Sequence, residues 1–188
     1  GNPISSFTIR AEARELVLSK WFDILGSLPD VSEVYFEACD LGGNRFHKLG
    51  KAFRNLANLS VLYLPGNQIS SLLPLKEVFE KHTGLTRLLL QDNQITSLSG
   101  LETATSLTVL GLHQNQITDI SGLAKLTRLT YLSLYENKII SVLPLTNLTG
   151  LTDLRLARNQ VTDISGLAKL SGLTHLDLFK NQITNILP

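Results

Sequence analysis

The stretch LTVLGLHQNQI at positions 107–117 returns three times along the chain, and only its polar letters change. It reads LTYLSLYENKI at 129–139, LTDLRLARNQV at 151–161 and LTHLDLFKNQI at 173–183. Each copy begins 22 residues after the previous one. Short repeats of fixed period form solenoids, because each repeat buries its apolar face against its neighbours. The sequence therefore predicts one elongated repeat domain.

The same frame, L-x-x-L-x-L-x-x-N-x-I, extends toward the N-terminus in longer units. It begins again at Leu85, and in units of 26 and 28 residues at Leu59 and Val31; a weaker copy begins at Ile4. The frame thus predicts eight successive strands. We expect a single domain, 1–188, in three parts: a degenerate helical first unit at 1–30, two long units at 31–84, and 22-residue units at 85–188, the last incomplete.

Within the frame, apolar positions 4 and 6 alternate with polar positions 3, 5 and 7, which is the pattern of a half-buried strand. Asparagine at position 9 follows the strand, where its side chain can donate to and accept from the backbone of the turn. We expect stacked copies to form a hydrogen-bonded ladder, with a small, buried cysteine in the first slot. The predicted ladder residues are Cys39, Asn67, Asn93, Asn115, Asn137, Asn159 and Asn181.

The segment after the asparagine differs between short and long units. In the short units apolar residues recur every third position, as at Ile117, Ile120 and Leu123, which favours a 3₁₀ or extended back wall. The long units show helical spacing instead. We expect an amphipathic helix over 13–25 that ends at Gly26, and shorter helices within 47–59 and 75–84.

The frame resembles the leucine-rich repeat. The stretch NQITDISGLAKLTRLTYL at 115–132 is similar to internalin repeats, and residues 31–59 resemble the ribonuclease-inhibitor type. A longer helical start followed by 22-residue units is also similar to the repeat domain of Roco GTPases. The resemblance implies a right-handed α/β horseshoe with a parallel concave sheet, helices behind the first units and 3₁₀ or extended segments behind the rest. It also implies protein binding on the concave face.

Frame positions 3, 5, 7 and 8 are expected to face outward along that sheet. Tyrosine and arginine, which often anchor protein interfaces, occur among them. The alternative is an ordinary solvated charged surface. Neighbouring strands lie about 4.8 Å apart, which predicts three ion pairs: Arg155 with Asp177, Asp153 with His175, and Glu136 with Arg158. The predicted partner-binding residues are His113, Tyr131, Tyr135, Glu136, Asp153, Arg155, Arg158, His175, Asp177, Phe179 and Lys180.

Composition argues against other classes of function. The net charge of +1 gives no field for nucleic acid, and no apolar run is long enough to span a membrane. His113 and His175 lie three strands apart, about 14 Å, too far to share a metal. We expect no enzyme and no cofactor.

Three roles remain from the sequence. The first is a non-catalytic module that binds another protein on its concave face. The second is the regulatory arm of a larger protein, such as a Roco-type GTPase, and the third is a self-associating array. Because the last repeat, which stops at Pro188, has no polar cap, we expect either that the parent protein continues or that chains pair end to end.

Overall fold

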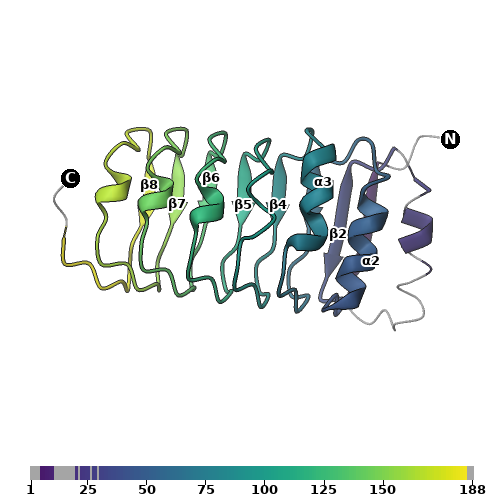
Figure 1. Ribbon diagram of the computed structural model, residues 1–188, viewed down its shortest axis with the longest axis horizontal. Helices are drawn as coiled ribbons and strands as arrows, with labels where there is room; N and C mark the ends of the chain where they lie inside the picture. The colour runs from purple at the N-terminus through teal and green to yellow at the C-terminus, as the bar shows by residue number, and fades with distance from the viewer. Residues whose placement is uncertain (1–4, 11–19, 21, 26, 29, 186–188) are drawn as a thin grey trace.

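The computed structural model describes residues 5–10, 20, 22–25, 27–28 and 30–185. Its strands form a single parallel sheet in chain order, so that each strand pairs with the strand of the next repeat (Figure 1). This confirms the predicted α/β solenoid of eight strands. The strands are β1 (Ser6–Arg10), β2 (Glu33–Glu37), β3 (Val61–Tyr63), β4 (Arg87–Leu89), β5 (Val109–Gly111), β6 (Tyr131–Ser133), β7 (Asp153–Arg155) and β8 (His175–Asp177).

The register of the sheet aligns equivalent frame positions from strand to strand. Leu110 of β5 pairs with Leu132 of β6, which pairs in turn with Leu154 of β7. Side chains at one frame position therefore form a column that runs across the sheet. Most strands cover only frame positions 3 to 5, and positions 7 and 8 lie in the turn that follows.

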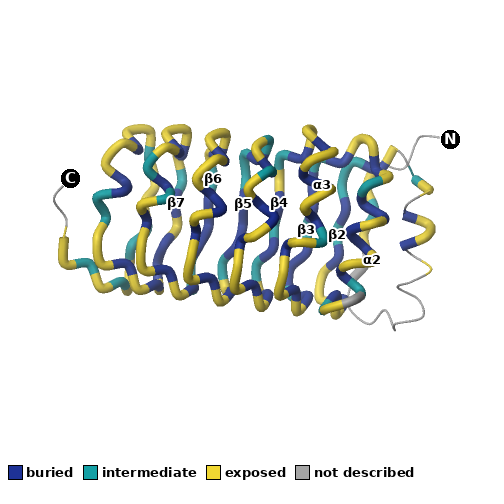
Figure 2. The backbone as a smooth tube through the Cα atoms, viewed as in Figure 1, coloured by how far each residue is buried: buried dark blue, intermediate teal, exposed yellow. Residues whose placement is uncertain are grey.

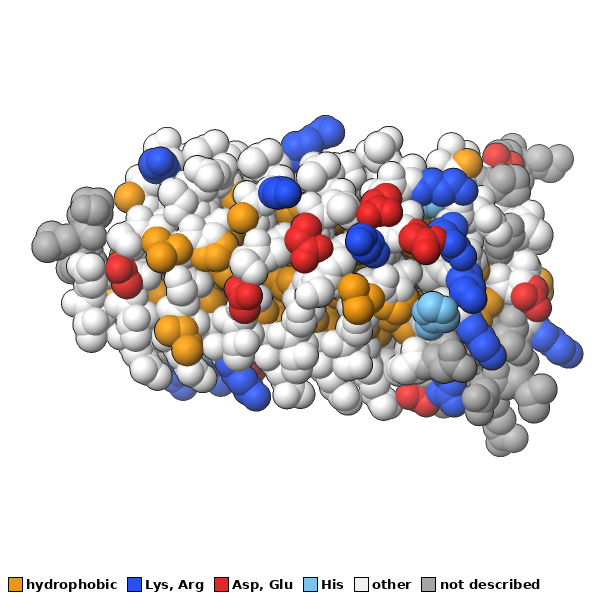
Figure 3. Space-filling model, in the orientation of Figure 1, with side chains coloured by type: hydrophobic (Ala, Val, Ile, Leu, Met, Phe, Trp, Pro, Cys, Tyr) orange, Lys and Arg blue, Asp and Glu red, His pale blue; other side chains and the backbone are white. Residues whose placement is uncertain are grey.

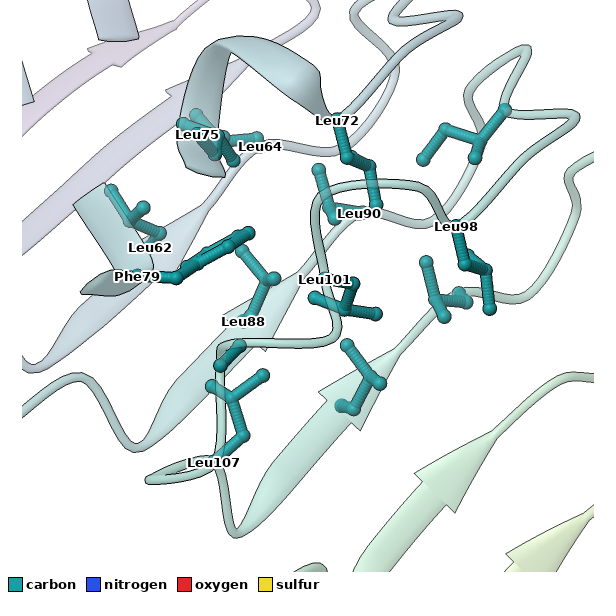
Figure 4. Packing of buried hydrophobic residues seen from close by; sticks show 14 of the residues in the cluster. Leu62, Leu64, Leu72, Leu75, Phe79, Leu88, Leu90, Leu98, Leu101 and Leu107 are labelled. Atoms are coloured by element: carbon teal, nitrogen blue, oxygen red, sulfur yellow. The ribbon is translucent and has the colours of Figure 1, made fainter. Parts of the chain in front are cut away.

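The core fills the space between the sheet and the back wall. Leucines of the strands, such as Leu62 and Leu88, lie against Leu101 and Phe79 from the segments behind them (Figure 4). Buried residues recur at the same places in successive coils (Figure 2). Each fully buried leucine contributes roughly 1.5–3 kcal/mol of transfer free energy, so the repeated apolar frame is what drives the coil to close.

The back wall changes along the chain as the unit lengths predict. Helices α2 (Asn44–Phe53) and α3 (Lys76–Lys81) form the back wall of the long units, on the side of the solenoid that faces the viewer in Figure 1. The 3₁₀ turn η1 (Leu73–Leu75) directly precedes α3 in the same long unit. Single 3₁₀ turns η2 (Ser121–Leu123), η3 (Leu143–Leu145) and η4 (Ser165–Leu167) lie in the units of β5, β6 and β7.

The helix lengths expected from the sequence need correction. The helix expected over 13–25 lies largely outside the described residues, of which 20 and 22–25 are helical. Helix α2 ends before the expected residue 59, because the amides of Asn55 and Leu56 turn back onto the carbonyls of Ala52 and Phe53. A second turn, in which the amide of Leu59 donates to the carbonyl of Leu56 at 3.2 Å, then leads to β3.

Candidate functional site

The turn that follows each strand from β3 to β8 is held by an asparagine side chain. Asn137 donates from Nδ2 to the carbonyls of Leu112 and Leu134, both at 3.0 Å, and accepts at Oδ1 from the amide of Ile117 at 3.0 Å. Asn159 makes the equivalent bonds one repeat later. Each asparagine thus ties its own turn to the preceding repeat and pairs backbone groups that burial would otherwise leave unsatisfied.

The first slot of this series is filled differently. The Cys39 thiol donates to the carbonyl of Glu37 at 3.3 Å, and the Cys39 amide donates to Oδ1 of Asn67 at 2.7 Å. Burial raises the pKa of the thiol to about 11. A thiol in this environment is a structural group rather than a nucleophile.

Frame position 8, directly before the asparagine, adopts a left-handed backbone conformation in every described turn from β2 onward. The value of φ is 55° at Gln114, 58° at Glu136 and 55° at Arg158. Only Gly66 among the position 8 residues is glycine. This left-handed conformation at position 8 was not anticipated from the sequence; these residues stand in the turn that follows each strand.

We call the outward surface of β1 to β8, together with the residues at positions 7 and 8 that follow each strand, the sheet face. Its C-terminal half carries the eleven residues predicted to bind a partner. Arg155, Arg158, His175, Phe179 and Lys180 are exposed there, and the other six are half-buried. The expected exposure was wrong at five other positions of the sheet face, which are buried: Val61, Pro65, Gly111, Ser133 and Ala157.

Each large cation in this half lies over an aromatic ring. The guanidinium carbon of Arg155 is 5.2 Å from the ring centroid of Tyr131, and that of Arg158 is 6.0 Å from the centroid of Tyr135. Nζ of Lys180 lies 5.4 Å from the ring of the adjacent Phe179. Such cation–π contacts fix the orientation of long side chains on an exposed surface.

The predicted ion pairs are correct in one case. Arg158 and Glu136 approach to 3.6 Å across neighbouring strands, as expected. Arg155, however, donates from Nε and Nη2 to the two carboxylate oxygens of Asp153, each at 3.1 Å. The expected pairs of Arg155 with Asp177 and of Asp153 with His175 were wrong, because the bidentate bond within one strand takes both groups.

These side chains surround a hollow of about 300 Å³ on the sheet face. Ser133, only 3% exposed, lies between Tyr131 and Tyr135 at the centre, and we call this depression the Ser133 hollow. His113 borders it from β5 and Arg155 from β7. Sequence reasoning omitted Ser133 from the predicted site. A small residue between two tyrosines on the same side of a strand was the sequence signal that could have indicated a depression here.

His113 is held in place at the border of the hollow. Its Nδ1 lies 3.3 Å from the hydroxyl of Ser133, and its ring is 6.5 Å from that of Tyr135. Burial lowers the pKa of His113, and nearby Arg155 lowers it further, whereas Asp92 raises it. The imidazole is therefore neutral at pH 7, which leaves the hollow bordered by one guanidinium and the carboxylate of Asp177.

A second tyrosine pair lies at the N-terminal end of the sheet face. The rings of Tyr35 and Tyr63 are 5.5 Å apart at an angle of 44°, and the hydroxyl of Tyr35 donates to Glu33 at 3.1 Å. This bond and burial raise the pKa of Tyr35. The two tyrosine clusters stand at opposite ends of the face, separated by β4 and β5.

The opposite face of the solenoid has a different chemical character. Basic side chains gather over α2, which contains Arg45, Lys48 and Lys51 and no acidic residue (Figure 3). Across the described part of the chain, no group of three or more His, Cys, Asp or Glu side chains is arranged to hold a metal ion. No helix in that part is long and apolar enough to cross a membrane.

A single sheet of stacked strands with an asparagine at each turn from β3 onward defines a class of repeat solenoid, and comparison with known proteins agrees with this. A family model described as "Leucine Rich repeats (2 copies)" matches residues 83–125, 105–147, 127–169 and 149–188. The chain belongs to the leucine-rich-repeat family, and its repeats are internalin-like. The search of curated proteins found no match.

Several solved structures are similar to this chain. Internalin C2 of Listeria monocytogenes is 38% identical, with a TM-score of 0.59 over 72% of this chain and 68% of that chain. Internalin F of the same organism is 25% identical, with a TM-score of 0.51 over 97% and 69%. The leucine-rich-repeat ectodomain of the Arabidopsis thaliana membrane receptor kinase GASSHO1/SCHENGEN3, solved in complex with CASPARIAN STRIP INTEGRITY FACTOR 2, shares the fold. Its TM-score is 0.72 at 24% identity, over 98% of this chain and 22% of that chain. Leucine-rich-repeat proteins of these types are typically non-enzymatic protein-interaction modules.

Proposed function

We propose that the chain is a protein-interaction module that binds its partner on the C-terminal half of the sheet face, across β5 to β8. The observation that carries the proposal is the contrast between the two sides of the strands. Inward positions are almost uniformly leucine, whereas outward positions differ from repeat to repeat and place two tyrosines, a histidine and an arginine around one hollow. Aromatic and arginine side chains held in fixed positions are typical anchors of protein interfaces.

The fixed geometry of these side chains supports binding rather than only solvation. Arg155 is held by Asp153 and by the ring of Tyr131, and Arg158 by Glu136 and the ring of Tyr135. Exposed ion pairs of this kind add little stability, commonly less than about 1 kcal/mol. They do reduce the rotamer entropy that arginine side chains lose on association, which favours binding. The complex of the related receptor ectodomain with another molecule is consistent with this class of function.

The test is capture of partners from the native host with immobilised protein. The Tyr131→Ala/Tyr135→Ala/Arg155→Ala variant should lose a specific partner. A matched variant with three exposed residues replaced away from the sheet face, Lys125→Ala/Arg128→Ala/Lys169→Ala, should retain it. Full retention by the first variant, or equal loss by both, would show that the partner binds elsewhere.

A further inference from the structure

The Ser133 hollow has the shape of an anchor site for one side chain. The buried Ser133 forms its floor, and its strand neighbours toward β5 and β7 are Gly111 and Arg155. A Cβ on Gly111 would lie 2.8 Å from Leu89 Cδ2, so the space above that glycine is already filled. Leu89 of β4 thus occupies the space above Gly111, next to the hollow. A volume of about 300 Å³ is at the lower end of the range for ligand pockets, which suits a single side chain.

The charged groups around the hollow already have hydrogen-bond or ion-pair partners. Asp153 accepts two bonds from Arg155, and the Asp177 carboxylate accepts from the amide of Phe179 at 3.0 Å. Glu136 is paired with Arg158. Arg155 and Asp177, which have opposite charges, both border the hollow, so an incoming ion of either sign gains little net attraction there. Burial of an ion without a free partner costs its hydration, and a neutral side chain avoids that cost.

The remaining surface is aromatic and neutral. The phenol rings of Tyr131 and Tyr135 and the imidazole of His113 border the floor from different sides. Aromatic side chains pack against one another in offset or edge-to-face arrangements, and such pairs contribute free energy beyond area burial alone. Ring edges suit this geometry here, because Arg155 and Arg158 each cover a face of one tyrosine.

We propose that the Ser133 hollow binds an uncharged aromatic side chain of the protein partner. This inference rests on the proposed function, and it specifies which type of partner side chain occupies the hollow. The anchor is a phenylalanine, tyrosine or tryptophan that projects from the partner onto β6. The paired charges of the surrounding face set the orientation of the partner around this anchor.

The test uses four small probes that differ only in their side chain: the N-acetyl amides of phenylalanine, tyrosine, lysine and aspartate. Each is titrated into the 188-residue chain while the NMR signals of Ser133, Tyr135 and His113 are followed. The two aromatic amides should produce saturable shifts at these residues with a Kd of about 1–10 mM, as expected for so few atoms. The lysine and aspartate amides should bind at least fivefold more weakly.

Two variants decide where the probe binds. Tyr131→Ala/Tyr135→Ala should abolish the saturable shifts. Tyr35→Ala/Tyr63→Ala removes two tyrosines from the other end of the same face and should leave them unchanged. Dispersed spectra establish that both variants fold. Ser133→Leu, which fills the floor, provides an independent block of the same site.

Three results would overturn the inference: no saturable shift with any probe, equal or tighter binding of a charged probe, or shifts centred on Tyr35 and Tyr63. None of these affects the partner-capture experiment. If the hollow fails to bind aromatic probes while the Tyr131, Tyr135 and Arg155 triple variant still loses a captured partner, the proposed function stands and the aromatic anchor is wrong.

Discussion

Arg155 donates two hydrogen bonds to the carboxylate of Asp153, and the same guanidinium lies 5.2 Å from the ring centroid of Tyr131. Residues 153 and 155 belong to β7 and lie on the same side of the sheet, because side chains alternate along a strand. Hydrogen bonding to Asp153 is the main cause that raises the pKa of Arg155. This pair sets the charge balance of the Ser133 hollow.

Replacing Asp153 by Asn should leave the fold almost unchanged and alter the charge preference of the hollow. Arg155 is exposed and Asp153 is half-buried, so water screens the pair and the loss in free energy of unfolding should stay below about 1 kcal/mol. Arg155 then loses the carboxylate that balances its charge. The N-acetyl amide of aspartate should therefore bind the variant several-fold more tightly than it binds wild type. Asp163→Asn, which removes a carboxylate outside the sheet face, is the matched control. Unchanged affinity for the anionic probe would contradict the charge-balance argument.

Asn137→Leu should destabilise the protein strongly. Asn137 pairs the buried amide of Ile117 and the carbonyls of Leu112 and Leu134, and leucine satisfies none of them. We expect a loss of about 2–4 kcal/mol in the free energy of unfolding, measured by urea denaturation.

Asn181→Leu is the comparison for this prediction. It changes the same slot in the last described repeat, where the side chain is only part-buried and water can replace the lost partners. Its effect should be clearly smaller. Equal losses at both positions would mean that burial does not set the energy of the asparagine ladder.

Gln114→Gly should raise the stability. Gln114 has φ 55°, a region that costs a residue with a Cβ roughly 1–2 kcal/mol and costs glycine almost nothing. The greater entropy of glycine in the unfolded chain offsets part of this gain, so we expect a net increase of about 0.5–1 kcal/mol, or about 1–4 °C in Tm. Gln116→Gly replaces the same residue type two positions later, where φ is not positive, and should lower the Tm. A lower Tm for Gln114→Gly than for Gln116→Gly would show that the turn at residue 114 is unstrained.

Gly166→Ala should destabilise the back wall between two repeats. A Cβ at Gly166 would lie 2.7 Å from the carbonyl oxygen of Val142 and 2.8 Å from Cα of Leu143, which is backbone and moves only with the repeat. Overpacking of this kind costs about 1–3 kcal/mol. At Gly172 the nearest atom would be the Leu151 oxygen at 3.5 Å, so Gly172→Ala should be close to neutral. The measurement is the calorimetric Tm of each variant. Equal Tm values for the two variants would contradict the predicted overpacking at Gly166.

The sequence predicts the solenoid well, because burial of leucine closes each coil and leucine is also the residue that recurs at fixed positions of the repeat. Leucines at frame positions 4 and 6 are buried wherever neighbours cover them, as Leu132 and Leu134 are. Leu176 of β8 keeps the same position and is 42% exposed at the open edge of the sheet. The predicted end-to-end association through this repeat stays a prediction.

The details of the candidate site were less predictable from sequence. A charged side chain on the sheet can reach an opposite charge on the neighbouring strand or one two residues along its own strand, and strand spacing does not distinguish the two. The prediction of pairs between neighbouring repeats was right for Glu136 with Arg158. It was wrong for Arg155, which forms a bidentate pair with Asp153 on its own strand. The left-handed turns were missed because Glu136 and Arg158 are not glycine. Their amides bond the next repeat instead, as Glu136 does to the carbonyl of Ala157 at 2.9 Å, and this pairing holds the strained conformation.

The buried His82 should make the protein less stable in acid. His82 is 4% exposed at the end of α3, where its amide donates to the carbonyl of Val78 at 2.8 Å. Burial lowers the pKa of its imidazole below the ordinary 6.5. As the pH falls through 6.5, the unfolded chain takes up a proton before the folded one does. The stability present above pH 6.5 is therefore lost progressively below it.

The measurement is Tm between pH 7.5 and 4.5 for wild type, His82→Phe and His47→Gln. His82→Phe cannot take up a proton at this position, so its Tm should fall less over this range than that of wild type. His47 is exposed on α2, and its replacement should leave the slope as in wild type. Carboxylates contribute equally to all three chains, so the difference in slope belongs to the imidazole of His82. Parallel slopes for wild type and His82→Phe would show that the folded protein accommodates a charged imidazole at this position.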